Sequence, residues 1–267
     1  MTPARWAASA GLLGVLLLAA PAFLGGAGDQ VNPVQRLRIP SLQHPFGTDQ
    51  LGRDLLARCI EGGQISLLVG VSVTLVAIGV GTAIGLLALR APALDVVLMR
   101  VADGLMAIPA ILIAVALVSV WGSSIPTLIL AIAVPEIPRV IRILRSALLS
   151  LRHAHFVEAA RMSGCGWTRL ILVHLLPNAW PVLIVQATYT MANAILIESG
   201  LSFIGLGVPG ETPSWGRIIA EGKLFFQLFP YQVLIPGVLL AATIWVINAF
   251  GDALRERLDP RLQAVAR

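Results

Sequence analysis

Long stretches without a charged residue dominate this sequence. Ile65–Leu89 contains no Asp, Glu, Lys or Arg, and neither does Gly104–Pro135. An α-helix needs about 20 apolar residues to cross the hydrocarbon core of a bilayer, because each residue advances it by only about 1.5 Å. Over the whole chain 57% of residues are hydrophobic and 12% are charged, whereas soluble domains average about 25% charged. The chain is therefore predicted to be an all-α membrane protein.

Six membrane-spanning helices are predicted from runs of about that length. The first, second, fifth and sixth lie at about Trp6–Leu24, Ile65–Leu89, Asn178–Ile197 and Tyr231–Phe250. The third and fourth share Gly104–Pro135, with the third beginning near Leu94 and turn residues at Trp121–Pro126 between them. This organisation divides the chain into residues 1–63, with the first span and an outer segment, and residues 64–267, a core of five helices.

The first 24 residues have a second interpretation. Arg5, the apolar Leu12–Leu18 and the small-residue site Ala20-Pro21-Ala22 also form the pattern of a cleaved signal peptide. A cleaved peptide and a retained span both start on the inside. The later spans therefore keep the same orientation in either case.

The basic residues set the predicted orientation, because loops rich in Arg and Lys stay cytoplasmic. With the N-terminus inside, thirteen of the nineteen basic residues are cytoplasmic: Arg5, Arg90, Arg100, Arg139, Arg142, Arg145, Arg152, Arg161, Arg169, Arg255, Arg257, Arg261 and Arg267. The outer group is Arg36, Arg38, Arg53, Arg58, Arg217 and Lys223. Both termini are predicted to be cytoplasmic, with Cys59 outside and Cys165 inside. Topology thus accounts for the net charge of +5 without a nucleic-acid partner.

The inner segment at about 146–177 holds the most informative motif. Glu158-Ala159-Ala160 favours a short helix, and Gly164 suits its C-terminal end because glycine adopts positive φ without a steric penalty. Pro177 is expected to stop whatever precedes it and to open the fifth span. The pattern predicts a short, rigid protrusion built from two helices.

This segment resembles the EAA loop of ABC importer permeases. Glu158-Ala159-Ala160, Gly164 and Leu176-Pro177 match the loop's pattern, and His174 replaces its usual Ile, as is common in the peptide and nickel branch. Four further blocks resemble the "C"-type permeases of that branch: His44–Asp54, Gly200–Gly207 followed by Thr212–Gly216, Asn248–Arg255 and Leu258–Arg261. The resemblance covers nearly the whole chain.

The resemblance implies a type I ABC importer permease fold in the plasma membrane of a bacterium. It implies a second permease subunit, two ATP-binding-cassette domains that bind ATP and Mg, and an external solute-binding protein. The substrate would be a dipeptide or oligopeptide, with nickel, haem or another small solute as the alternative. The residues implied to couple the chain to the ATPase are Glu158, Ala159, Ala160, Arg161, Gly164 and Pro177.

Charged residues inside spans are functional candidates, because burying charge in a bilayer is costly. Asp103 is expected to pair with Arg100, and Glu136 with Arg139, each at helical i,i+3 spacing. Glu136, between Pro135 and Pro138, is a candidate for the transport pathway. Glu198 is a second pathway candidate, and its place near the outer boundary is expected to let it reach water.

Two other classes of function are weaker interpretations. An ion-coupled secondary transporter often shows two related halves, and no internal repeat is evident. A membrane-embedded enzyme would need paired acids, a histidine cluster or an activated nucleophile. His44, His153, His155 and His174 fall on both sides of the bilayer, so no metal site is predicted. No GxxxxGK[ST] loop occurs, so no catalytic residue or cofactor is assigned to this chain.

Overall fold

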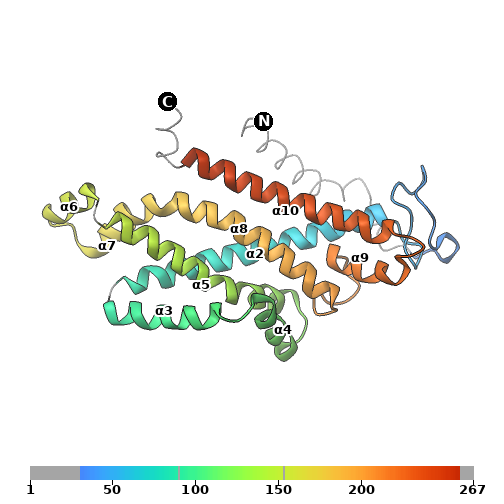
Figure 1. Ribbon diagram of the computed structural model, residues 1–267, viewed down its shortest axis with the longest axis horizontal. Coiled ribbons are helices and arrows are strands. Elements are labelled where there is room, and N and C mark those ends of the chain that lie inside the picture. Colours follow the sequence, from blue (N-terminus) through green and yellow to red (C-terminus); the bar gives the residue numbers. More distant parts are fainter. Residues whose placement is uncertain (1–30, 90, 153, 259–267) are drawn as a thin grey trace.

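Long helices lying side by side form the body of the molecule (Figure 1). The computed structural model describes residues 31–89, 91–152 and 154–258. Its helices are α2 (Leu55–Ala88), α3 (Pro92–Met106), α4 (Ala110–Trp121), α5 (Ile125–Leu151), α6 (His155–Met162), α7 (Trp167–Arg169), α8 (Leu176–Phe203), α9 (Trp215–Gly222) and α10 (Tyr231–Leu258). A π-helical turn, η3 (Leu170–Leu175), joins α7 to α8, and 3-10 turns lie at Pro33–Gln35 and Lys223–Phe225. In these ranges the only β pairing is an isolated bridge between Thr48 and Asp54.

Three of these helical stretches are long and apolar enough to cross a membrane. They are Leu55–Ala88, Trp167–Phe203 and Tyr231–Leu258. A fourth candidate is the pair α3 and α4, which meet at an angle of 88°. The sequence analysis predicted a single helix here, the third span. Pro109 stands between α3 and α4 and removes a helical hydrogen bond, so the span is broken into two helices. The first predicted span, Trp6–Leu24, lies outside the described residues, and the helix that holds the fourth, Ile125–Leu151, is not among the candidates, so the count of six remains a prediction.

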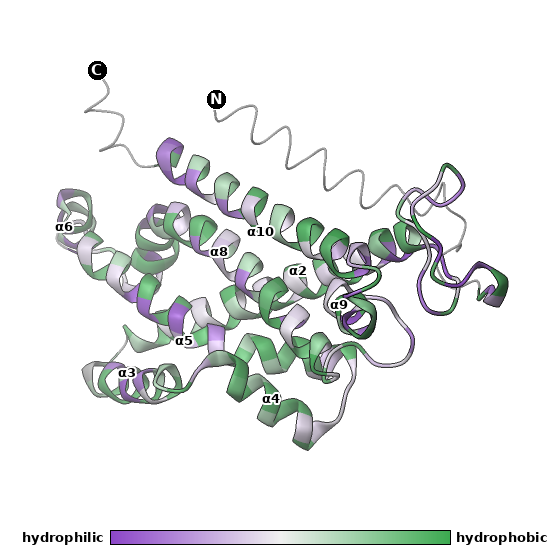
Figure 2. Cartoon of the chain, turned by 45° about the vertical axis from the view of Figure 1, so that its right-hand side comes forward, coloured by the Kyte–Doolittle hydropathy of each residue, from purple (hydrophilic) through white to green (hydrophobic). Residues whose placement is uncertain are grey.

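The long helices extend further than the predicted spans, and α2 and α5 do so most. α2 begins at Leu55, ten residues before the predicted start at Ile65, and Asp54 caps it by accepting a hydrogen bond from the Ala57 N–H. Its 34 residues make a helix about 51 Å long. α5 continues beyond Pro135 and Pro138 to Leu151, because neighbouring helices support a proline-containing turn. Figure 2 shows α5 carrying hydrophilic residues between apolar ones.

The core lies where α5 packs between α2 and α8. Small residues on α2 allow the close approach. A Cβ added at Gly81 would lie 2.7 Å from the Val140 side chain of α5, and one at Gly70 would lie 2.7 Å from Ile195 of α8. These distances are shorter than normal van der Waals contacts, so larger residues would push the helices apart. α5 therefore lies alongside two helices of spanning length.

The two ends of the bundle carry different elements (Figure 1). Residues 31–54 and α9 lie at one end, which we call the α9 end. α6 and α7 lie at the other, which we call the α6 end. The predicted outer basic residues fall on segments of the α9 end, whereas Arg152, Arg161 and Arg169 fall at the α6 end. The structure therefore separates the predicted outer basic residues from Arg152, Arg161 and Arg169, whereas Arg139, also predicted to be cytoplasmic, lies at the middle of α5.

Candidate functional site

The predicted protrusion is present at the α6 end. Helix α6 ends with two hydrogen bonds that form a Schellman motif: the Cys165 N–H donates to the Ala160 carbonyl, and the Gly164 N–H donates to the Arg161 carbonyl, both at 3.0 Å. Gly164 has φ +76°, and a Cβ there would meet no atom within 4 Å. The glycine is thus required by the backbone turn and not by lack of space, and its predicted positive φ is confirmed.

One side of the protrusion packs on the bundle and the other faces away from it. Val157 is buried in an apolar cluster with Leu170, Ile171 and Leu175 of η3. Glu158, Ala159 and Arg161 are exposed. Large apolar side chains are exposed as well, with Met162 at 86% and Phe156 at 40%. The exposed face therefore combines charged and apolar groups, a composition suited to contact with another protein.

Pro177 does not stop the helix before it, contrary to the sequence prediction. The chain is helical without interruption from Trp167 to Phe203, with the π turn η3 directly before Leu176. Proline has no N–H and its ring crowds the carbonyl four residues earlier, and a π turn changes the local hydrogen-bond pattern at such a point. The Asn178 side chain also donates to the His174 carbonyl at 2.6 Å. The protrusion is thus continuous with a helix that runs the length of the bundle.

Glu136 of α5 forms a polar cluster inside the bundle. Nη1 of Arg139 lies 3.0 Å from its Oε2, which confirms the predicted i,i+3 pair. Nδ2 of Asn193, on α8, donates to its Oε1 at 2.6 Å. The Glu136 side chain is fully buried, whereas that of Arg139 is 44% exposed. The carboxylate is therefore held from two helices and the arginine reaches the surface of the chain.

Two aspartates of α3 pair with arginines of α5. Asp103 forms an ion pair with Arg142. The sequence expectation that Arg100 would be its partner was wrong, because the side chain at 103 lies toward α5. Asp95 accepts two hydrogen bonds from Arg145, at 2.6 and 2.7 Å. These pairs hold α3 against the C-terminal half of α5.

Glu198 does not reach water in this chain. Its side chain is fully buried, where Ser66 of α2 donates to Oε2 at 2.8 Å and Ser202 donates to Oε1 at 2.7 Å. The expectation of exposure was wrong because α2 extends past this level and covers it. Hydroxyl donors satisfy the carboxylate. Glu198 therefore joins α8 to α2.

A second charged cluster, which the sequence reasoning missed, lies at the α9 end. Arg58, only 1% exposed, donates from Nη1 to Asp49 at 2.8 Å and to Glu221 at 2.7 Å. Arg53 reaches the same two carboxylates, at 2.7 and 3.2 Å. Burial would raise the pKa of Glu221, but hydrogen bonds and positive charge from Arg58, Arg217 and Arg53 lower it below its usual value. We call these five residues the α9-end ion cluster.

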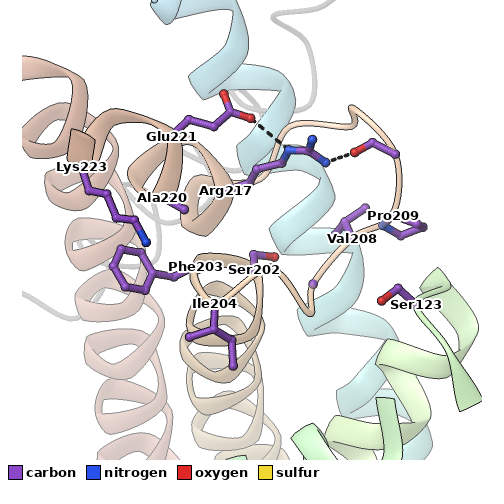
Figure 3. A pocket seen from close by; sticks show the side chains of 13 residues that line it. Ser123, Ser202, Phe203, Ile204, Val208, Pro209, Arg217, Ala220, Glu221 and Lys223 are labelled. Carbon is purple, nitrogen blue, oxygen red and sulfur yellow. Dashed lines mark hydrogen bonds and ion pairs between the residues drawn. The ribbon is translucent and has the colours of Figure 1, made fainter. Parts of the chain in front are cut away.

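A pocket of about 620 Å³ lies beside this cluster. Figure 3 shows it between the end of α8, the loop after it and α9, with Ser123 on the opposite wall. Arg217 donates to Glu221 at 3.0 Å, and Lys223 lies 4.9 Å from the centre of the Phe203 ring. The wall contains both apolar and charged groups. The matched sequence block Gly200–Gly207 contributes much of it.

The chain is similar to known transport proteins over most of its length. Residues 75–264 match the family described as "Binding-protein-dependent transport system inner membrane component". A probable peptide ABC transporter permease of Sinorhizobium fredii is 46% identical over 92% of this chain and 84% of its own length. The dipeptide transport system permease of Alkalihalophilus pseudofirmus is 36% identical over 94% of this chain and 83% of its own.

The fold is that of a solved permease. An inward-facing structure of the MetNI methionine ABC transporter superposes with a TM-score of 0.65, covering 76% of this chain and 97% of that one at 19% identity. These relatives are membrane transport subunits and not enzymes. The chain adopts the type I ABC importer permease fold and is a multi-pass membrane protein. The family match and the identities show that this chain belongs to the binding-protein-dependent transport system inner membrane components.

Proposed function

We propose that this chain forms half of the translocation pathway of an ATP-driven peptide importer in the bacterial inner membrane. The observation that carries the proposal is its similarity to named peptide permeases over more than nine-tenths of the chain. Its partners would be a second permease subunit, two ATP-binding-cassette domains and an external solute-binding protein. ATP and Mg would be bound by the ATPase subunits, and this chain would bind no cofactor.

The protrusion at the α6 end is proposed as the part that docks on the ATPase. Glu158, Ala159, Ala160 and Arg161 would form the contact with Gly164 shaping it, and exposed Met162 and Phe156 would supply apolar contact area. The Schellman motif and buried Val157 hold the protrusion in one position on η3. Because α7, η3 and α8 are continuous, a push on the protrusion would tilt α8 as a rigid body. Pro177 lies at the junction through which that tilt would pass.

Glu136 is proposed as a pathway residue through its contact with Arg139. Its carboxylate is buried, so its influence on a solute would act through the half-exposed arginine that it holds. Glu198 was the second pathway candidate. Its three hydroxyl neighbours, Ser66, Ser199 and Ser202, instead support a role in joining α8 to α2.

The test is uptake by a reconstituted complex. This chain, its partner permease and the ATPase are placed in liposomes, and the solute-binding protein is added outside with radiolabelled trialanine. We expect ATP-dependent accumulation that requires the binding protein. ATP-dependent uptake of nickel or haem in place of the peptide would replace the substrate assignment. Uptake driven by an ion gradient without ATP would indicate a secondary transporter and contradict the proposal.

A further inference from the structure

Arg139 lies at the middle of a helix that packs between two others. α5 runs from Ile125 to Leu151, so fourteen residues precede Arg139 and twelve follow it in that helix. α5 packs between α2 and α8, both of which are long and apolar enough to span a bilayer. Arg139 is therefore placed near the midplane, about 15 Å from either edge of a hydrocarbon core about 30 Å thick.

A half-exposed guanidinium at that depth cannot face lipid. An arginine near a helix end can extend to the headgroup region, but one at the midplane is too far from it. Charged residues at such depths face the interior of a bundle or a water-filled cavity. The exposed edge of Arg139 can therefore face only the partner permease or an aqueous route past this chain. Arg142, exposed one turn further toward the α6 end, lies on the same side of α5.

The geometry leaves part of the guanidinium available. Both hydrogen bonds to Glu136 use Nη1, at 3.2 and 3.0 Å. Among the described residues, Nη2 and Nε of Arg139 contact no carboxylate. Glu136 cannot turn away, because Asn193 of α8 holds it at 2.6 Å and its side chain is fully buried. The guanidinium is therefore fixed in direction, with Nη2 and Nε left over from its contact with Glu136.

We propose that Arg139 binds the C-terminal carboxylate of the peptide in transit. This inference rests on the proposed peptide function. Peptides differ in their side chains but share their terminal charges and backbone, so a route that carries many sequences can recognise only those common groups. A guanidinium is the side chain that best matches a carboxylate.

The pair with Glu136 also explains why such a site would not trap its cargo. Glu136 already balances the arginine's charge, so a second carboxylate gains hydrogen bonds but little net charge attraction. Transport requires a site that binds well enough to receive the solute and weakly enough to release it. An arginine without Glu136 would bind more tightly and release more slowly.

The experiment measures peptide imported per ATP hydrolysed in the reconstituted full complex, with trialanine and with its C-terminal amide. Each peptide is supplied at a concentration that loads the binding protein to the same extent, checked on that protein alone. The variants are Arg139→Gln, Arg139→Lys and, as a control, Arg100→Gln, which changes an exposed arginine of α3. Assembly with the partner permease and ATP hydrolysis stimulated by the loaded binding protein are measured for each.

We expect Arg139→Gln to assemble and to hydrolyse ATP at the wild-type rate while importing roughly tenfold less trialanine per ATP, the change that follows from losing one charge-assisted hydrogen bond. Arg139→Lys should recover part of the loss, and Arg100→Gln should resemble the wild type. The amide should be imported poorly by the wild type and no worse by Arg139→Gln.

Four results would overturn the inference. The first is normal trialanine import per ATP by Arg139→Gln, and the second is an equal loss in Arg139→Gln and Arg100→Gln. The third is an equal effect of Arg139→Gln on import of the acid and of the amide. The fourth is failure of Arg139→Gln to assemble. The last would place Arg139 at the contact with the partner permease. If the wild-type complex imports no peptide at all, the proposed function fails instead.

Discussion

Nη1 of Arg58 lies 2.7 Å from Oε2 of Glu221, although 163 residues separate the two in the chain. The pair joins the N-terminal end of α2 to α9, and Trp215 of α9 donates a hydrogen bond to the Cys59 carbonyl at 2.8 Å. The sequence block that contains Arg53 and the block that contains Trp215 therefore form one structural unit. This unit closes the α9 end of the bundle beside the pocket.

Replacing Glu221 should destabilise the fold. Glu221→Gln leaves Arg58 and Arg53 buried with one carboxylate fewer, at a cost on the order of 2–3 kcal/mol. Thermal unfolding is followed with a thiol-reactive dye, because Cys59 is fully buried and becomes reactive when the α9 end opens. Glu211→Gln is the matched control, since Glu211 is 82% exposed and 3.8 Å from Arg53. Equal unfolding temperatures for the two variants would contradict a structural role for Glu221.

The folded chain should become less stable in acid because Glu221 becomes protonated. The pKa of Glu221 is lowered in the folded chain from its ordinary value of 4.5. Its contribution is therefore complete above pH about 4.5 and is lost as pH falls through the lower folded-state pKa. The unfolding temperature of the wild type should drop below pH 4.5 more steeply than that of Glu221→Gln. Parallel curves for the two proteins would show that another group is responsible.

The turn at Gly164 should be the most sensitive position of the protrusion. A side chain at φ +76° costs about 1–2 kcal/mol, and a β-branched one adds bulk to the proposed contact. Gly164→Val should insert in the membrane but lose coupled uptake, with Gly164→Asn less affected because Asn tolerates this conformation. Gly166→Ala is the control, since Gly166 has φ −66°. Glu158→Lys should give a milder defect. Wild-type uptake by Gly164→Val would disprove the coupling role.

The two cysteines should report the orientation of the chain. Cys165 is partly exposed at the α6 end and Cys59 is fully buried at the α9 end. The topology alone predicts labelling of Cys59 from outside, but its burial means that an impermeant maleimide should label neither thiol in intact cells. In inverted membrane vesicles the reagent should label Cys165, and Cys165→Ser should abolish the signal. Labelling of Cys165 in intact cells would reverse the proposed orientation.

Features that depend on residues close together in the sequence could be predicted from the sequence alone. The uncharged runs located most of the long helices, because the thickness of a bilayer sets the number of apolar residues required. The turn at Gly164 and the pair between Glu136 and Arg139 followed from the geometry of one helical turn. The predicted positions of helix ends were less accurate. The start of α2 at Leu55 depends on the cap at Asp54, which no apolar pattern shows.

Contacts between helices were decided only by the tertiary structure. Asp103 pairs with Arg142, 39 residues away, and not with Arg100 in its own helix. Glu198 accepts a hydrogen bond from Ser66, at a separation of 132 residues. Such pairs depend on which faces of two helices meet, and many rotations of a helix satisfy the same apolar pattern. The α9-end ion cluster likewise depends on which segments pack together. The sequence thus determined which segments are helical and which turn is rigid, whereas packing determined which charges are buried together and which, like Arg139, stay accessible.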